Sequence, residues 1–158
     1  MRTLRYGPRQ VPTVNGIAAT AAFVVGGILI VSSSYIHFHL WQKLGYRNIP
    51  TIGPLFLAQS IAGLLLGLVV MAVRSVWVAI LGVGFAASTM AGFLVSEQHG
   101  LFGFKDAWSS PFAHEAFALE VATIGVLVIA GALCLIGSAP PSDHSGGTKL
   151  RADPQWGR

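Results

Sequence analysis

Charged residues and cysteine are scarce in this sequence. Asp, Glu, Lys and Arg make up 10% of its 158 residues, hydrophobic residues make up 53%, and the mean hydropathy is +0.65. This composition is typical of membrane proteins rather than of soluble globular domains. The single cysteine, Cys134, cannot form a disulfide within the chain, and no Cys-x-x-Cys motif is present. The sequence therefore argues against a thiol–disulfide enzyme.

A basic stripe suited to nucleic acid is also absent. The net charge is +4, but the ten Lys and Arg residues are spread over the ends of apolar segments and the two tails. Nucleic-acid binding would need them clustered on one surface. No nucleophile–base pair, phosphate-binding loop or pair of catalytic carboxylates is recognisable, so the sequence favours a protein that is not an enzyme.

Long apolar segments are what the sequence does contain. Four apolar runs of 20 to 23 residues occupy residues 14–36, 52–73, 76–95 and 116–136. A helix rises about 1.5 Å per residue, so about 20 residues cross a hydrocarbon core of about 30 Å. We therefore predict an all-α fold, an antiparallel bundle of four transmembrane helices within residues 14–137. The first helix should continue beyond the bilayer as far as Gly45, a residue suited to end it.

The remaining segments are predicted to be a basic N-terminus, one outer loop and a tail. Residues 1–13 carry three arginines, and residues 138–158 are rich in Ser, Pro and Gly, which predicts a disordered tail. Between the third and fourth spans, Phe102, Phe104 and Trp108 alternate with polar residues. Aromatic residues in this setting indicate a loop that lies in the outer membrane interface.

The distribution of basic residues predicts the orientation. Seven of the ten Lys and Arg residues lie in the N-terminus, the turn between the second and third spans, and the C-terminal tail, and three lie on the other side. Cytoplasmic segments carry an excess of Lys and Arg, so both termini are predicted to be cytoplasmic.

Small residues recur at a spacing of four in three of the spans. They are Ala18, Ala22 and Gly26 in the first, Gly63 and Gly67 in the second, and Gly84, Ser88 and Gly92 in the third. Such residues let helix backbones approach each other closely, so these faces are predicted to be helix–helix contacts.

Glu120 is the sharpest candidate for a functional residue, because it lies inside an apolar span. A carboxylate there is costly unless it is paired, protonated or facing a wet cavity. Gln59, Ser33 and Thr89 lie at a similar depth below the outer ends of the other spans. We therefore predict a polar pocket at this level, in which Glu120 contacts Gln59 or a serine of the first span. Arg47, in the loop after the first span, is a further candidate for the pocket, and Arg47 or Lys105 is an alternative partner for Glu120.

Four of the five histidines lie at the same end of the predicted bundle: His37, His39, His99 and His114. Imidazole is a ligand of zinc, copper and iron and the usual axial ligand of haem. His37 and His39 are about 200° apart around a helix, so they cannot bind one ion together. A site would combine His37, His99 and His114, one from each of three helices. The cofactor is left open between a metal ion, haem and none, because interfacial histidines can also be simple boundary residues.

Three functional hypotheses follow from these features. The first is a membrane protein with an outward-facing polar pocket, acting as a binding or accessory subunit of a cell-envelope complex. The second is a metal- or haem-binding redox protein that uses the three histidines. The third is a small proton-coupled transporter with Glu120 as its coupling carboxylate. In each case the lipid bilayer is a partner, and a membrane-protein complex or a homo-oligomer stays open.

Two motifs carry a resemblance to known proteins. The run GYRNIPTIGPLFL occupies residues 45–57, and GLFGF occupies residues 100–104. With these motifs the chain resembles a group of small, uncharacterised four-span membrane proteins from actinobacteria, over about residues 15–137. The resemblance implies four-span architecture and a location in the plasma (inner) membrane of a bacterium.

Overall fold

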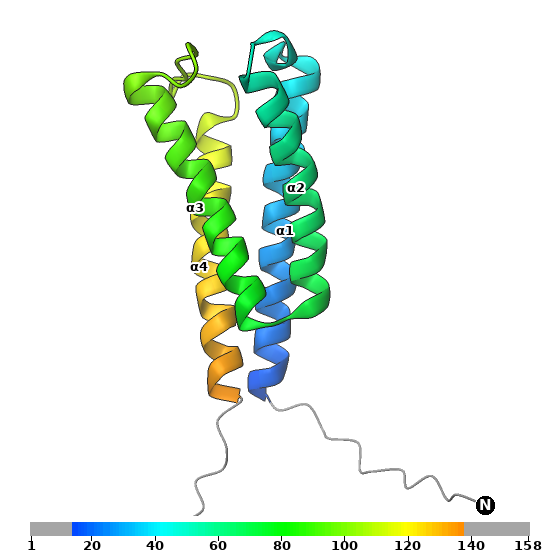
Figure 1. Ribbon diagram of the computed structural model, residues 1–158. Helices are drawn as coiled ribbons and strands as arrows, with labels where there is room; N and C mark the ends of the chain where they lie inside the picture. Colours follow the sequence, from blue (N-terminus) through cyan, green and yellow to red (C-terminus); the bar gives the residue numbers. More distant parts are fainter. Residues whose placement is uncertain (1–13, 138–158) are drawn as a thin grey trace, which may run out of the picture.

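The computed structural model describes residues 14–137, which form four antiparallel α-helices and one short 3₁₀ helix (Figure 1). Their bounds are α1 Val14–Lys43, η1 Tyr46–Asn48, α2 Ile52–Val73, α3 Val76–His99 and α4 Ala113–Gly137. All four α-helices are long and apolar enough to cross a membrane, which confirms the predicted all-α, four-span fold. The predicted basic N-terminus, residues 1–13, and disordered tail, residues 138–158, lie outside the described residues.

Three of the helices are longer than the apolar runs that predicted them. α1 continues to Lys43, α3 continues to His99, and α4 begins at Ala113. Backbone hydrogen bonding does not stop where polar side chains begin, so an apolar run marks the membrane-crossing part of a helix rather than its full length. α1 ends just before Gly45, whose φ of 82° lies in the left-handed region that glycine adopts without steric cost.

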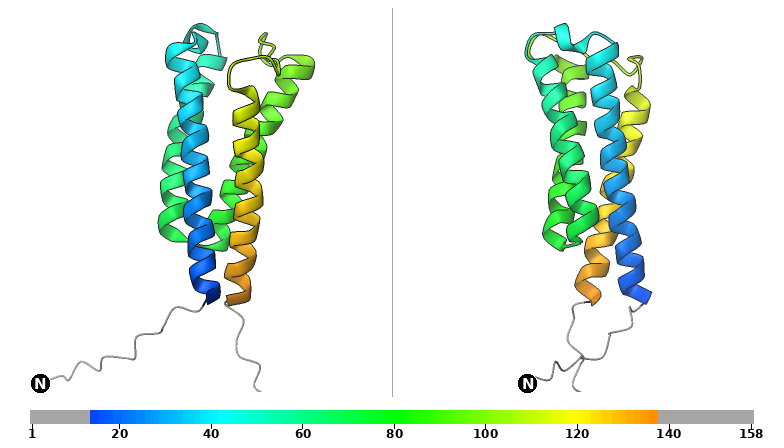
Figure 2. Two further views of the ribbon diagram at one scale, coloured as in Figure 1. Left: turned by 180° about the vertical axis from the view of Figure 1, so that it is seen from behind. Right: turned by 90° about the vertical axis from the view of Figure 1, so that its right-hand side faces the viewer.

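The helices pack side by side in the order α2, α1, α4, α3. α1 packs broadly on both α2 and α4, and α3 packs on α4, whereas α2 and α3 touch over a short stretch only. α2 and α3 are joined by a turn at Arg74 and Ser75 and diverge away from it (Figures 1 and 2). We call the end of the bundle that carries the 44–51 and 100–112 loops the loop end, and the opposite end the turn end.

The turn-end half of the bundle has a closely packed apolar core. Its buried side chains include Phe23, Ile30, Val70, Leu127 and Ala130. Glycines make room for Leu127: a Cβ atom at Gly26 would lie 2.9 Å from the Leu127 Cγ atom. In this half, apolar side chains and glycines fill the space between the helices.

Close helix approach occurs where the small residues of α2 meet α1. A Cβ atom at Gly67 would lie 2.7 Å from the Val31 Cγ2 atom and 2.8 Å from the Gly27 carbonyl oxygen. The corresponding prediction for α3 is wrong. A Cβ atom at Gly84 or Gly92 would meet nothing within 4 Å, because this face of α3 does not pack against another described helix.

Aromatic contacts hold the two loops against the loop end. The Tyr46 and Phe104 rings lie 5.7 Å apart, and the Trp108 and Phe93 rings lie 4.8 Å apart. Phe102 is exposed. Of the three aromatic residues that predicted an interfacial loop, one therefore faces outward, and the other two pack into the bundle.

Candidate functional site

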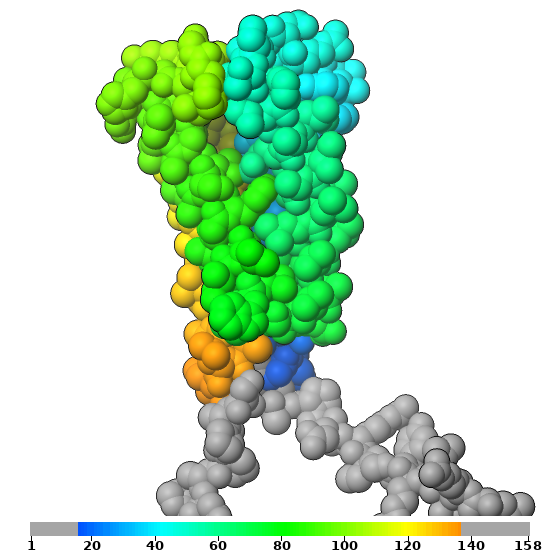
Figure 3. Space-filling model, in the orientation of Figure 1, coloured from blue at the N-terminus to red at the C-terminus, as the bar shows by residue number. Residues whose placement is uncertain are grey.

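A cavity of about 250 Å³ lies between the helices at the loop end. Residues of all four α-helices and both loops line it, and the surface is hollowed between α3 and α2 in the space-filling view (Figure 3). Its walls are mainly apolar and aromatic, with rings from Tyr46, Phe56, Phe93, Phe104, Phe112 and Phe117. The divergence of α2 and α3 from their turn thus creates space where the turn-end half has a filled core.

Glu120 lies on the wall of this cavity, seven residues into α4 and about 10 Å from the start of that helix. The side chain is 2% exposed. The Ser33 hydroxyl of α1 donates a hydrogen bond of 2.5 Å to its Oε1 atom. Glu120 therefore faces the bundle interior and contacts a serine of the first span, as the sequence predicts.

Gln59 and Thr89 form a second polar link, between α2 and α3. The Gln59 side-chain amide donates to the Thr89 hydroxyl, which itself donates to the Phe85 carbonyl oxygen at 3.0 Å. Both residues line the cavity. The polar layer that the depths of these residues predict therefore consists of two separate hydrogen-bonded pairs, Ser33 with Glu120 and Gln59 with Thr89.

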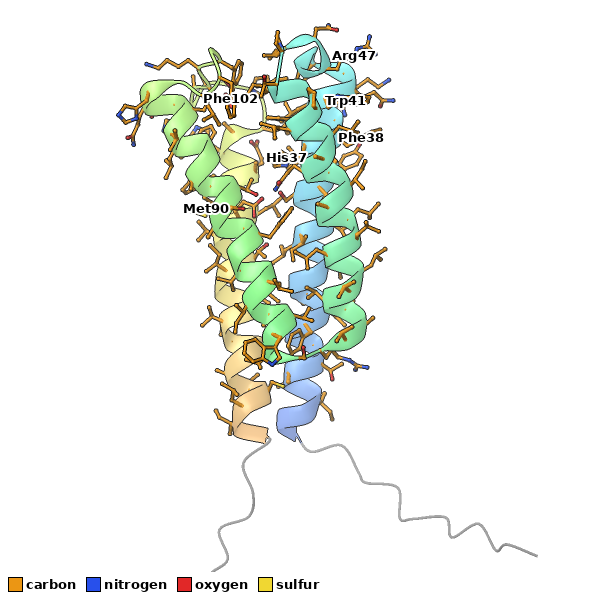
Figure 4. All side chains as sticks on the ribbon, viewed as in Figure 1. His37, Phe38, Trp41, Arg47, Met90 and Phe102 are labelled. Carbon is orange, nitrogen blue, oxygen red and sulfur yellow. The ribbon has the colours of Figure 1, made fainter. Side chains whose placement is uncertain are left out.

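Arg47 does not belong to this group. It is exposed in η1, and Figure 4 shows it at the tip of the loop end. Glu120 is buried about two turns into α4, so it has Ser33 rather than Arg47 as its partner. Lys105 is likewise exposed, so the alternative of an ion pair between Glu120 and Arg47 or Lys105 is wrong in this structure.

His37 is the histidine that reaches the cavity. It is 8% exposed, lines the cavity, and packs its ring 5.2 Å from that of Phe56 (Figure 4). Its Nδ1 atom lies 2.9 Å from the Ser33 carbonyl oxygen. A carbonyl oxygen only accepts, so Nδ1 carries the proton in this bond, and Nε2 of the neutral ring is left as an acceptor. Among the described residues, the Ser33 carbonyl oxygen is the one hydrogen-bond partner of the His37 ring.

The structure does not bring His37, His99 and His114 together. His99 is exposed at the end of α3, and His114 is exposed and stacks on Trp108 at 5.4 Å. Within residues 14–137, no group of three His, Cys, Asp or Glu side chains is arranged to hold a metal ion. The three histidines lie at one end of the bundle, but His37 faces the cavity, whereas His99 and His114 are exposed.

Two residues of the loops, Tyr46 and Asp106, add to the polar part of the cavity. Asp106 is half-buried, and its Oδ1 atom accepts a hydrogen bond of 2.9 Å from the Ala107 backbone N–H. Burial raises the pKa of the Tyr46 phenol, the negative charge of Asp106 raises it further, and the contact with Ser110 opposes both. Sequence reasoning missed Asp106 and Tyr46, because loop residues have no periodicity that shows which way they face.

Among the described residues, the cavity lining contains two carboxylates, Glu120 and Asp106, and no Lys or Arg. No protein-family model, curated protein or solved structure matches this chain. The resemblance to small actinobacterial four-span proteins accordingly stays a prediction.

Proposed function

We propose that this protein binds a small amphipathic molecule in the loop-end cavity. One observation carries the proposal: the Glu120 carboxyl group is 2% exposed yet borders a cavity of about 250 Å³. Ionisable residues inside membrane spans are expensive and commonly mark binding or transport sites. An apolar pocket with a few convergent polar groups is also the usual form of a small-molecule site.

The contrast between the two halves of the bundle supports a binding role over a purely structural one. Fixing the register of α1 and α4 would need only the Ser33–Glu120 hydrogen bond within a filled core. The turn-end half has such a core, in which Leu127 fills the space beside Gly26 and Gly82. Beside Glu120 the space is left open. The cavity therefore favours ligand binding over an accessory role in a cell-envelope complex.

Two glycines of α3 offer a matched test. Gly92 lines the cavity and Gly84 does not, and a Cβ atom at either position would meet nothing within 4 Å. Gly92→Leu should therefore fill the cavity without forcing the backbone apart, and Gly84→Leu should add the same side chain outside it. Both variants should keep the far-UV circular dichroism and gel-filtration profile of the unmodified protein.

Binding would be measured by equilibrium dialysis of the protein in lipid nanodiscs, with empty nanodiscs as the control for partition into lipid. The probes are naphthylethylamine and naphthylethanol, which share one aromatic body and differ in the polar group. Saturable binding of at least one probe, lost in Gly92→Leu and kept in Gly84→Leu, is the expected result. If neither probe binds saturably, or if both variants behave alike, the cavity is not a binding site and the proposal is wrong.

The orientation of the cavity is part of the proposal. The excess of Lys and Arg on the turn-end side supports cytoplasmic termini, so the loop end would face the outside of a bacterial inner membrane. A reporter enzyme that is active only in the periplasm, fused after Arg158, should then be inactive. The same reporter inserted beside the exposed Phe102 should be active. The opposite pattern would invert the orientation.

A further inference from the structure

The charged groups of the cavity lining differ in kind from those of a site for an anion. Two of them are carboxylates, Glu120 and Asp106, and no Lys or Arg lines the cavity in the described part of the chain. Building on the proposed function, we infer that the ligand is a protonated organic amine, with its ammonium group at Glu120 and its apolar body among the aromatic rings.

Hydrogen-bonding capacity is the first ground for this inference. A carboxylate accepts through two oxygens with about four lone-pair positions. Within residues 14–137, Ser33 supplies the one hydrogen bond that the Glu120 carboxyl receives. Acceptor capacity is therefore left over on a side chain that is 2% exposed and faces the cavity. An ammonium group supplies up to three N–H donors on one atom and matches that surplus.

His37 adds an independent acceptor to the same cavity. Because its Nδ1–H donates to the Ser33 carbonyl oxygen, its Nε2 atom is an acceptor that has no hydrogen-bond donor among the described side chains. The ring is 8% exposed and lines the cavity. Ser33 joins the two acceptors, since its hydroxyl bonds to Glu120 and its carbonyl oxygen to His37. A ligand group placed between Glu120 and His37 must therefore donate hydrogen bonds rather than accept them.

Charge is the second ground. An uncompensated carboxylate costs free energy in a membrane span, and a bound cation removes that cost. The aromatic walls act in the same direction, because the face of an aromatic ring attracts a cation within about 6 Å of its centroid. Phe117 is placed three residues before Glu120 on α4, and Phe56 is packed on His37. An anionic ligand would meet two carboxylates here and, among the described residues, no Lys or Arg side chain.

The matched probes test the charge of the ligand directly. Naphthylethylamine is protonated at neutral pH and naphthylethanol is neutral, so the ratio of their dissociation constants isolates the ammonium group. A charge-assisted hydrogen bond is stronger than a neutral one, so the amine should bind at least about tenfold more tightly, or about 1.4 kcal/mol. Glu120→Gln keeps the side-chain shape and removes the charge, and should bring the ratio of the two dissociation constants close to one.

Glu115 provides the control for the loss of a negative charge. It is exposed on α4, five residues before Glu120, and does not line the cavity, so Glu115→Gln should keep the preference for the amine. Equal binding of the amine and the alcohol to the unmodified protein would overturn the inference and leave the proposed binding function standing. Saturable binding of neither probe would instead overturn the binding function. The first comparison needs no variant, so the inference is tested even if Glu120→Gln fails to fold.

Discussion

The hydrogen bond between Ser33 and Glu120 can be tested by removing the serine hydroxyl alone. In Ser33→Ala the carboxyl group stays in place but loses its donor, and the two side chains are 1% and 2% exposed. The Ser33 carbonyl oxygen, which accepts from His37, is untouched by this change. The variant therefore isolates one side-chain contact between α1 and α4.

The expected loss is about 1–1.7 kcal/mol in the free energy of unfolding. Leaving a buried polar group without its partner costs about 1–3 kcal/mol. Measured side-chain hydrogen bonds between membrane helices are weaker, at about 0.6 kcal/mol on average and about 1.7 at most. The bond in this protein is buried and involves a carboxyl group, which favours the upper part of the membrane range.

Ser34→Ala is the matched control. Ser34 is the next residue of α1, is 4% exposed, and donates to the Ile30 carbonyl oxygen of its own helix at 2.8 Å. That carbonyl already lies in the helical hydrogen-bond ladder, so losing the hydroxyl should cost less than about 0.5 kcal/mol. Reversible unfolding in mixed micelles, followed by far-UV circular dichroism, would give both values. Equal losses in the two variants, or no loss in Ser33→Ala, would refute the assigned role of the bond.

Three further predictions concern packing, pH and the link between α2 and α3. Gly67→Ala should lower the free energy of unfolding by about 1–3 kcal/mol, because the added Cβ atom would press on the α1 backbone. Gly84→Ala should be neutral or stabilising by up to about 1 kcal/mol, because a Cβ atom there meets nothing within 4 Å. Chemical unfolding of the two variants would measure both changes. Burial raises the pKa of the Tyr46 phenol, so its contribution to stability should be complete below about pH 10 and decline as the pH rises through the higher folded-state pKa. In a pH series of melting curves, Tyr46→Phe should show a smaller loss of stability at alkaline pH than the unmodified protein. Gln59→Ala and Thr89→Ala should show a coupling of about 0.6–1.7 kcal/mol in a double-mutant cycle, and additive losses would argue against their hydrogen bond.

The depth of the polar residues could be read from the sequence, but their partners could not. Counting from the span ends places Ser33, Gln59, Thr89 and Glu120 at one level, because every residue of a helix advances the chain by the same rise. The rotation of each helix about its axis decides which of them meet. That rotation depends on packing in the other half of the bundle, where Gly67 brings α2 close to α1. Ser33 consequently meets Glu120, and Gln59 meets Thr89.

The histidines illustrate the same division. Their positions at span ends predict that they share one end of the bundle, and the helix directions bear this out. Only His37 lines the cavity, whereas His99 and His114 are exposed. The position of a residue in the sequence determines its height along the bundle, but not the direction in which its side chain points around the helix axis.

By itself, the sequence determined four membrane-length helices, the burial of a carboxyl group in the last of them, and the glycine at which α1 ends. These follow from local quantities: the length of an apolar run, the cost of a polar group in hydrocarbon, and the φ angle available to one residue. The tertiary structure decided that α2 and α3 diverge, that a cavity opens beside Glu120, and that Asp106 and Tyr46 join its lining. These features depend on how four helices rotate and tilt together, and that arrangement is set by contacts between residues far apart in the chain.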